Sequence, residues 1–188
     1  MAKIVSERAD LLPAMAEVFR EHGYEGASIA LISEKTGLGK GSLYHFFPGG
    51  KEEMAAAVLR EIEAWFTTRI FAPLQWDSDP GAAIDQMFRA VLEYFDSGRR
   101  VCLVGAFALA SSRDLFAKPV RSYFTVWREA LSAALVRAGH NRSSSYQLAE
   151  EVLAGIQGSL VLTRGLSDRG VFERAIARLR GLVLEKIG

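Results

Sequence analysis

The stretch from Ser28 to Lys51 constrains the fold of this chain more than any other segment. It reads SIALISEKTGLGKGSLYHFFPGGK. It predicts two short helices joined by a tight turn at Thr36-Gly37, because glycine readily adopts the left-handed conformation that ends a helix. We expect the hydroxyl of Ser28 to cap the first helix. Pro48 and the two glycines after it are expected to end the second helix.

The second helix of this stretch, expected over residues 40–47, has two different faces. At about 100° per residue, one arc of about 140° holds a cation, a glycine and two hydrogen-bonding rings: Lys40, Gly41, Tyr44 and His45. The opposite arc is apolar and holds Leu43, Phe46 and Phe47. A helix with one packing face and one polar face is able to rest on a protein core and enter a DNA groove.

The remaining sequence also favours helices, and it contains no alternating segment long enough to predict a strand. Ser6 is the expected cap of the first helix, and Gly23 is expected to end it. Pro13 is expected to kink that helix or to start a new segment, because proline lacks a backbone N–H. Further helices are expected over residues 51–71, 80–97, 102–112, 117–138, 144–166 and 170–187. We therefore predict an all-α protein of about nine helices.

The order of these helices predicts two domains. Residues 1–50 are expected to form a three-helix headpiece with the helix-turn-helix, and residues 51–188 a helical regulatory domain. The helix expected at 51–71 follows Pro48-Gly49-Gly50 without a longer linker. It is therefore expected to couple the headpiece mechanically to the rest of the chain.

Charge and composition limit the functions to be considered. The chain of 188 residues carries a net charge of +1, and its first 60 residues hold seven Lys and Arg against eight Asp and Glu. Any DNA affinity must therefore come from local placement of cations rather than from a general basic field. The sequence has no apolar run of transmembrane length and no secretory pattern, so we expect a soluble, cytoplasmic protein.

The headpiece also carries an ordered set of aromatic, glycine, hydroxyl and lysine positions. These are Phe19, Gly23-Tyr24, Ser28, Ile32, Gly37-Leu38, the run Lys40–Phe47 and Lys51. The order resembles the N-terminal domain of TetR-family transcriptional repressors over residues from about 19 to 59. The ending Pro48-Gly49-Gly50-Lys51 is similar to the LmrA/YxaF-type branch of that family, which includes multidrug-responsive regulators.

The resemblance implies a role for individual positions. Ser28, Thr36 and Lys51 would approach backbone phosphates, and Lys40 and Gly41 would enter the major groove. The rings that follow would touch phosphates or thymine methyls. The complete DNA-binding set implied in this way is Ser28, Thr36, Lys40, Gly41, Ser42, Tyr44, His45 and Lys51.

The last two expected helices carry small and apolar residues at regular spacing, which either close the core of the monomer or form an interface. In the family that this chain resembles, the last two helices of two subunits form a four-helix bundle. The resemblance therefore implies a homodimer, whose two recognition helices match a palindromic operator on double-stranded DNA. The interface residues expected from it are Gly155, Gly158, Leu162, Phe172, Ile176, Leu179 and Val183.

The middle of the chain is rich in aromatic residues, which either fill a core or line an apolar cavity for a small molecule. The resemblance favours a pocket for an inducer of unknown identity. Our candidate wall residues are Phe88, Cys102, Phe107, Tyr123 and Trp127. Cys102, the single cysteine, is either a redox sensor at a helix N-terminus or a small buried hydrophobe.

The sequence gives no indication of a metal site, a cofactor or catalysis. The three histidines lie far apart without a ligand-spaced partner, and no nucleophile and base can be singled out together.

The sequence leads to two hypotheses about function. The first is a ligand-responsive DNA-binding regulator, most simply a repressor that is not an enzyme. The alternative is an α-helical small-molecule-binding protein or enzyme with a vestigial headpiece.

Overall fold

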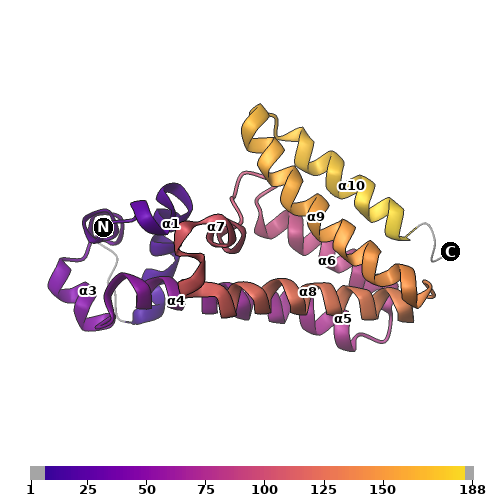
Figure 1. The fold of residues 1–188 in the computed structure, drawn as a ribbon, viewed down its shortest axis with the longest axis horizontal. Coiled ribbons are helices and arrows are strands. Elements are labelled where there is room, and N and C mark those ends of the chain that lie inside the picture. The colour runs from indigo at the N-terminus through magenta and orange to yellow at the C-terminus, as the bar shows by residue number, and fades with distance from the viewer. Residues whose placement is uncertain (1–6, 185–188) are drawn as a thin grey trace. The chain divides into compact units, whose positions relative to one another are not determined.

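A computed structural model describes residues 7–184 of the chain, and within that part every regular element is a helix (Figure 1). The prediction of an all-α protein is thereby confirmed. The described part holds ten α-helices, where the sequence predicted about nine. The expected cap at Ser6 and the outer ends of the first and last expected helices lie outside the described residues.

The N-terminal elements are a 3₁₀ turn, Arg8–Leu11, followed by α1 (Leu12–Gly26), α2 (Ile29–Thr36), α3 (Lys40–Phe46) and α4 (Gly50–Phe66). Pro13 lies in the first turn of α1, where a missing N–H costs nothing, so it starts a new segment rather than kinking one. Gly23 has a φ of 67° and interrupts the helical path near the end of α1.

The helix-turn-helix forms as the sequence predicts. The hydroxyl oxygen of Ser28 accepts a hydrogen bond from the backbone N–H of Leu31 at 3.1 Å and caps α2. Gly37 ends that helix in the left-handed conformation, with φ 72° and ψ 12°. α3 ends at Phe46, one residue earlier than expected, and Phe47 is its non-helical C-terminal cap.

The C-terminal elements begin with a π-helical turn, Thr67–Phe71, and α5 (Ala72–Trp76). They continue with α6 (Pro80–Tyr94), α7 (Leu103–Leu109), a 3₁₀ turn (Ser111–Phe116), α8 (Ala117–Arg137), α9 (Arg142–Leu166) and α10 (Gly170–Leu184).

The largest differences from the predicted helix bounds are found in three helices. The helix expected over 51–71 is α-helical from Gly50 to Phe66, and the π-helical turn Thr67–Phe71 follows it. α6 ends at Tyr94 rather than at residue 97, because Asp96 and Ser97 adopt positive φ and turn the chain. α7 is also shorter than expected, so Cys102 precedes the helix instead of opening it.

The chain forms two compact units, each of which has its own core. The first comprises the described residues up to Ala64 together with Leu103–Val120, and the second comprises Trp65–Cys102 and the described residues from Arg121 onward. The first unit therefore includes α1 to α3, most of α4, and α7. The boundary predicted at residue 50, between a DNA-binding headpiece and a regulatory domain, stays a prediction.

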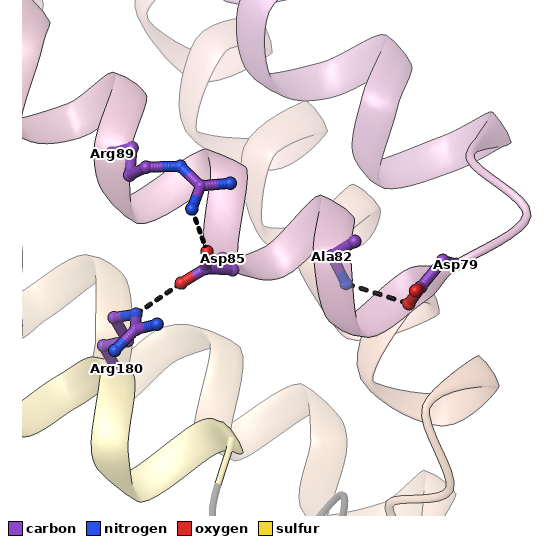
Figure 2. Close-up of polar contacts among 5 residues, drawn as sticks. All are labelled: Asp79, Ala82, Asp85, Arg89 and Arg180. Atoms are coloured by element: carbon purple, nitrogen blue, oxygen red, sulfur yellow. Dashed lines mark hydrogen bonds and ion pairs between the residues drawn. The ribbon is translucent and has the colours of Figure 1, made fainter.

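The second unit is held by packed helices and by polar contacts at its surface. α9 and α10 lie side by side, and α10 also packs on α6 (Figure 1). The carboxylate of Asp79 caps α6 by accepting a hydrogen bond from the backbone N–H of Ala82 at 2.9 Å (Figure 2). The core is strongly aromatic: Phe66, Phe88, Phe95, Trp127 and Phe172 are fully buried.

Candidate nucleic-acid interface

Helix α3 presents its predicted polar face to solvent. The residues expected to meet DNA on this helix are all exposed: Lys40, Gly41, Ser42, Tyr44 and His45. On the opposite side, Leu43 and Phe47 are fully buried and Phe46 is half-buried. The buried side fixes α3 to the headpiece core, and the exposed side leaves a cation and two hydrogen-bonding rings free for a groove.

Hydroxyl groups fix the turn between α2 and α3. The hydroxyl of Thr36 donates to the carbonyl oxygen of Ile32 at 2.6 Å. The hydroxyl of Ser33 donates to the carbonyl oxygen of Leu38 at 2.5 Å, across the turn. Ser28 and Thr36, the two predicted phosphate contacts, thus also form hydrogen bonds that hold α2. Ser28 is exposed and Thr36 is half-buried. The sequence pattern gives no sign of this contact of Ser33.

Lys51, in the first turn of α4, lies against the end of α1. Its ammonium donates to the carbonyl oxygen of Tyr24 at 2.8 Å and to that of Glu25 at 3.4 Å. It also lies 4.5 Å from the centre of the Tyr24 ring, which is a cation–π distance. These contacts, to carbonyl oxygens and a ring, fix the position of Lys51 without pairing it with a carboxylate.

A second cationic contact holds the end of the recognition helix. The guanidinium of Arg8 donates to the carboxylate of Glu53 at 2.7 Å and lies 4.3 Å from the centre of the Phe47 ring. The same carboxylate accepts the backbone N–H of Gly49 at 2.7 Å. The Gly49 hydrogen bond, followed by the Arg8 contact, lowers the pKa of Glu53. Arg8 and Glu53 were not part of the predicted site, because their contact joins segments 45 residues apart in sequence.

The five predicted wall residues of the pocket are all buried, but they do not lie in one unit. Phe88, Cys102, Tyr123 and Trp127 belong to the second unit, whereas Phe107 belongs to the first. There the ring of Phe107 packs against those of Phe19, Tyr24 and Phe116, with centroids 5.0–6.1 Å apart.

Tyr123 and Trp127 belong to an aromatic cluster in the second unit. Their ring centroids are 5.7 Å apart, and both pack on Phe66, at 4.8 and 5.2 Å. Burial raises the pKa of the Tyr123 hydroxyl well above its ordinary value, and the neighbouring Cys102 contributes to the same shift. The indole N–H of Trp127 donates to the sulfur of Met87 at 3.3 Å. The hydroxyl of Tyr123 and the indole N–H of Trp127 are therefore polar donors within an otherwise apolar cluster.

The seven predicted interface residues divide into two groups. Phe172, Ile176 and Val183 are at most 1% exposed and belong to the core of their own chain. Gly155 lets α10 approach α9, because a Cβ there would lie 2.9 Å from a methyl carbon of Leu179. Gly158 instead faces open space, and Leu162 is 53% exposed.

Other apolar side chains of α9 and α10 are also exposed. Val161 is 68% exposed and Leu166 65% exposed on the same helix, and Leu182 of α10 is 41% exposed. Val161 and Leu166 were not among the predicted interface residues, because an apolar residue at helical spacing looks the same whether it faces its own core or solvent.

No helix between residues 7 and 184 is long and apolar enough to cross a membrane. In the same part of the chain, no three His, Cys, Asp or Glu side chains are grouped so as to hold a metal ion.

A helix-turn-helix with an exposed recognition face, joined to a larger helical unit, defines the class of one-component DNA-binding regulators. Comparison with known proteins gives the family. Residues 11–58 match the model of bacterial regulatory proteins of the TetR family. Residues 80–178, more than half of the chain, match the C-terminal domain of LmrA/YxaF-like transcriptional regulators.

Individual relatives agree with these matches. The chain is 27% identical over 166 residues to the uncharacterized HTH-type transcriptional regulator YxaF of Bacillus subtilis, covering 86% of this chain and 87% of the relative. It is 26% identical over 160 residues to the HTH-type transcriptional regulator LmrA of the same organism, covering 83% and 85%.

A solved structure supports the fold. The crystal structure of a TetR transcriptional regulator from Legionella pneumophila superposes with a TM-score of 0.82 at 21% identity, covering 96% of this chain and 99% of the other. The chain belongs to the TetR family of transcriptional regulators, in its LmrA/YxaF-like branch.

Proposed function

We propose that this protein is a repressor that binds a palindromic operator as a homodimer and leaves it when a small apolar molecule binds its C-terminal domain. The exposed polar face of α3, over the buried Leu43 and Phe47, carries the DNA-binding part of this proposal. Lys40 and Gly41 would meet base edges, while Ser28, Thr36 and Lys51 would meet phosphates. Ser42, Tyr44 and His45 complete the surface.

A two-fold dimer through α9 and α10 would place two recognition helices on successive major grooves, about 34–36 Å apart. The exposed apolar residues of these helices support this part of the proposal: Gly158, Val161, Leu162, Leu166 and Leu182. Phe172, Ile176 and Val183 would act indirectly by holding α10 against its own core.

The inducer would bind at the aromatic cluster around Tyr123 and Trp127. α4 begins at Gly50, next to the recognition helix in the chain, and ends at Phe66, whose ring contacts both of these residues. A ligand that prefers the conformer with wrongly spaced headpieces would lower operator affinity by linkage, because it shifts the population toward that conformer.

The experiment that tests the proposal is a binding titration on the DNA upstream of the protein's own gene. We expect a shifted complex on a palindromic fragment, with an affinity that falls steeply as salt rises. A random duplex of equal length is the control. If no palindrome in that region gave salt-sensitive binding with Lys40 and Lys51 intact, the repressor proposal would be wrong and the alternative of a vestigial headpiece would be favoured.

A further inference from the structure

The carboxylate of Glu25 joins the end of α1 to a segment much later in the chain. One carboxylate oxygen accepts the hydroxyl of Ser111 at 2.9 Å and the backbone N–H of Ser112 at 2.8 Å. These residues lie 86 and 87 positions away in sequence, yet within the same compact unit. Hydrogen bonds to an ionised acceptor are stronger than those between neutral groups.

The same corner of the backbone holds Lys51. The carbonyl oxygens of Tyr24 and Glu25 are the two acceptors of its ammonium. The ring of Tyr24 packs edge-on against Phe116, with centroids 5.0 Å apart. The corner Tyr24–Glu25 is therefore attached to α4 through Lys51 and to the Ser111–Phe116 turn through a carboxylate and a ring.

The position of the corner determines where the charge of Lys51 lies. A lysine ammonium has three N–H donors, so one remains for a phosphate when two carbonyls are bound. A free lysine side chain has many rotamers, and ordering it costs binding free energy. A corner that already holds the ammonium removes part of that cost, provided that the corner itself is fixed.

We infer that Glu25 is a positioning residue for DNA binding, which acts through Lys51 by fixing the corner Tyr24–Glu25 against Ser111 and Ser112. The inference rests on the proposed function, since it concerns the affinity for DNA. The segment held by Glu25 continues directly into α8, the helix that carries Tyr123 and Trp127. Loss of this contact would therefore lower the affinity for DNA.

The test uses a duplex selected from a random-sequence pool by the wild-type protein. Its affinity is measured for wild type, Glu25→Ala, Ser111→Ala and Lys51→Ala, and for the double variant of Glu25 and Lys51. Glu21→Ala is the matched control, because it removes the same charge from an exposed position of the same helix. Circular dichroism and thermal unfolding verify that each variant is folded.

We expect Glu25→Ala to weaken binding about tenfold and Ser111→Ala about threefold, with the salt dependence unchanged since neither variant removes a cation. Glu21→Ala should bind as wild type or slightly more tightly. In the Lys51→Ala background, Glu25→Ala should have no further effect, because the two residues act as one unit.

Two results would overturn the inference while leaving the proposed function intact. The first is tighter binding by Glu25→Ala, which would mean that only its negative charge matters. The second is an equal loss with and without Lys51, which would mean that Glu25 acts on the headpiece in general. Failure of the wild-type protein to select any duplex would instead contradict the proposed function.

Discussion

The carboxylate of Asp85 on α6 accepts a hydrogen bond from the guanidinium of Arg180 on α10 (Figure 2). Arg89, one turn further along α6, donates to the other oxygen of the same carboxylate. The side chain of Asp85 is only 17% exposed, whereas that of Arg180 is 52% exposed. Asp85 thereby links α6 to α10 through Arg180, a residue 95 positions further along the sequence.

Replacing Asp85 by alanine should lower the free energy of unfolding by about 1 kcal/mol, because the bonds are charge-assisted but partly screened by solvent. Urea denaturation at a fixed protein concentration measures the change. Asp114→Ala is the control, since its side chain is 93% exposed and lies 3.7 Å from Arg113. An equal effect of the two substitutions would show that the α6–α10 link adds no stability.

Lys40 and Lys51 should affect DNA binding in different ways. Lys40→Ala should reduce the preference for operator over random DNA by about 1–3 kcal/mol, because an exposed cation at the start of α3 would read base edges. Lys51→Ala should weaken binding to both DNAs and reduce the salt slope by about 1, because it would lose a phosphate contact. Titrations on both duplexes at several salt concentrations separate the two effects. The same loss on operator and random DNA from both variants would contradict this division.

The dimer proposal predicts that charges on α9 separate the subunits. Leu162→Glu together with Leu166→Glu should convert the dimer to a monomer, because both side chains are exposed and would face each other across the interface. Light scattering after size exclusion measures the mass. Leu109→Glu is the matched control, because Leu109 is 87% exposed on α7. A dimer that survives the double substitution would place the interface elsewhere.

Gly98 and Gly139 allow backbone strain to be separated from steric overlap. Both have positive φ, 90° and 100°. A Cβ at Gly98 would lie 2.6 Å from the Cβ of the buried Phe172, whereas nothing lies within 4 Å at Gly139. Gly139→Ala should therefore cost about 1 kcal/mol and Gly98→Ala about 2–4 kcal/mol. Thermal unfolding measures both changes. Similar losses of stability would mean that Phe172 moves aside at little cost when a Cβ is added at Gly98.

The lowered pKa of the Glu25 carboxylate predicts a pH dependence of the free energy of unfolding. Hydrogen bonds from its own backbone N–H, from that of Ser112 and from the hydroxyl of Ser111 lower its pKa from 4.5 to about 2. Because the folded pKa is the lower one, the carboxylate stabilises the fold above the unfolded value and this contribution is lost as pH falls toward 2.

The free energy of unfolding of wild type should therefore exceed that of Glu25→Gln by a constant amount above about pH 5 and converge with it in acid. Glu21→Gln serves as the control. A difference that does not change between neutral pH and pH 2 would show that the carboxylate is not held as described.

Much of the DNA-binding unit was predictable because its determinants are local. The cap at Ser28, the left-handed Gly37 and the exposed face of α3 depend on turn chemistry and on a helical period of about 3.6 residues. The same local signals also identified most helices. Their ends were less accurate where the backbone leaves the helical path, as at Asp96 and Ser97.

The surroundings of the candidate pocket and interface residues were less predictable, because they depend on packing between distant segments. Phe88, Phe107, Tyr123 and Trp127 have the same aromatic character in the sequence, yet Phe107 joins the core of the first unit. Phe172 and Leu162 are both apolar at helical spacing, yet one is fully buried and the other is exposed. Periodicity identifies a face but not what covers it.

The sequence by itself determined the all-α class, the helix-turn-helix and the residues that α3 presents to solvent, because neighbouring residues fix these through backbone geometry and capping. Only the tertiary structure decided that Glu25 holds Ser111 and Ser112, that Asp85 holds Arg180, and that Lys51 lies on the corner at Tyr24. Such contacts depend on which distant segments the fold brings together, and no local pattern specifies that.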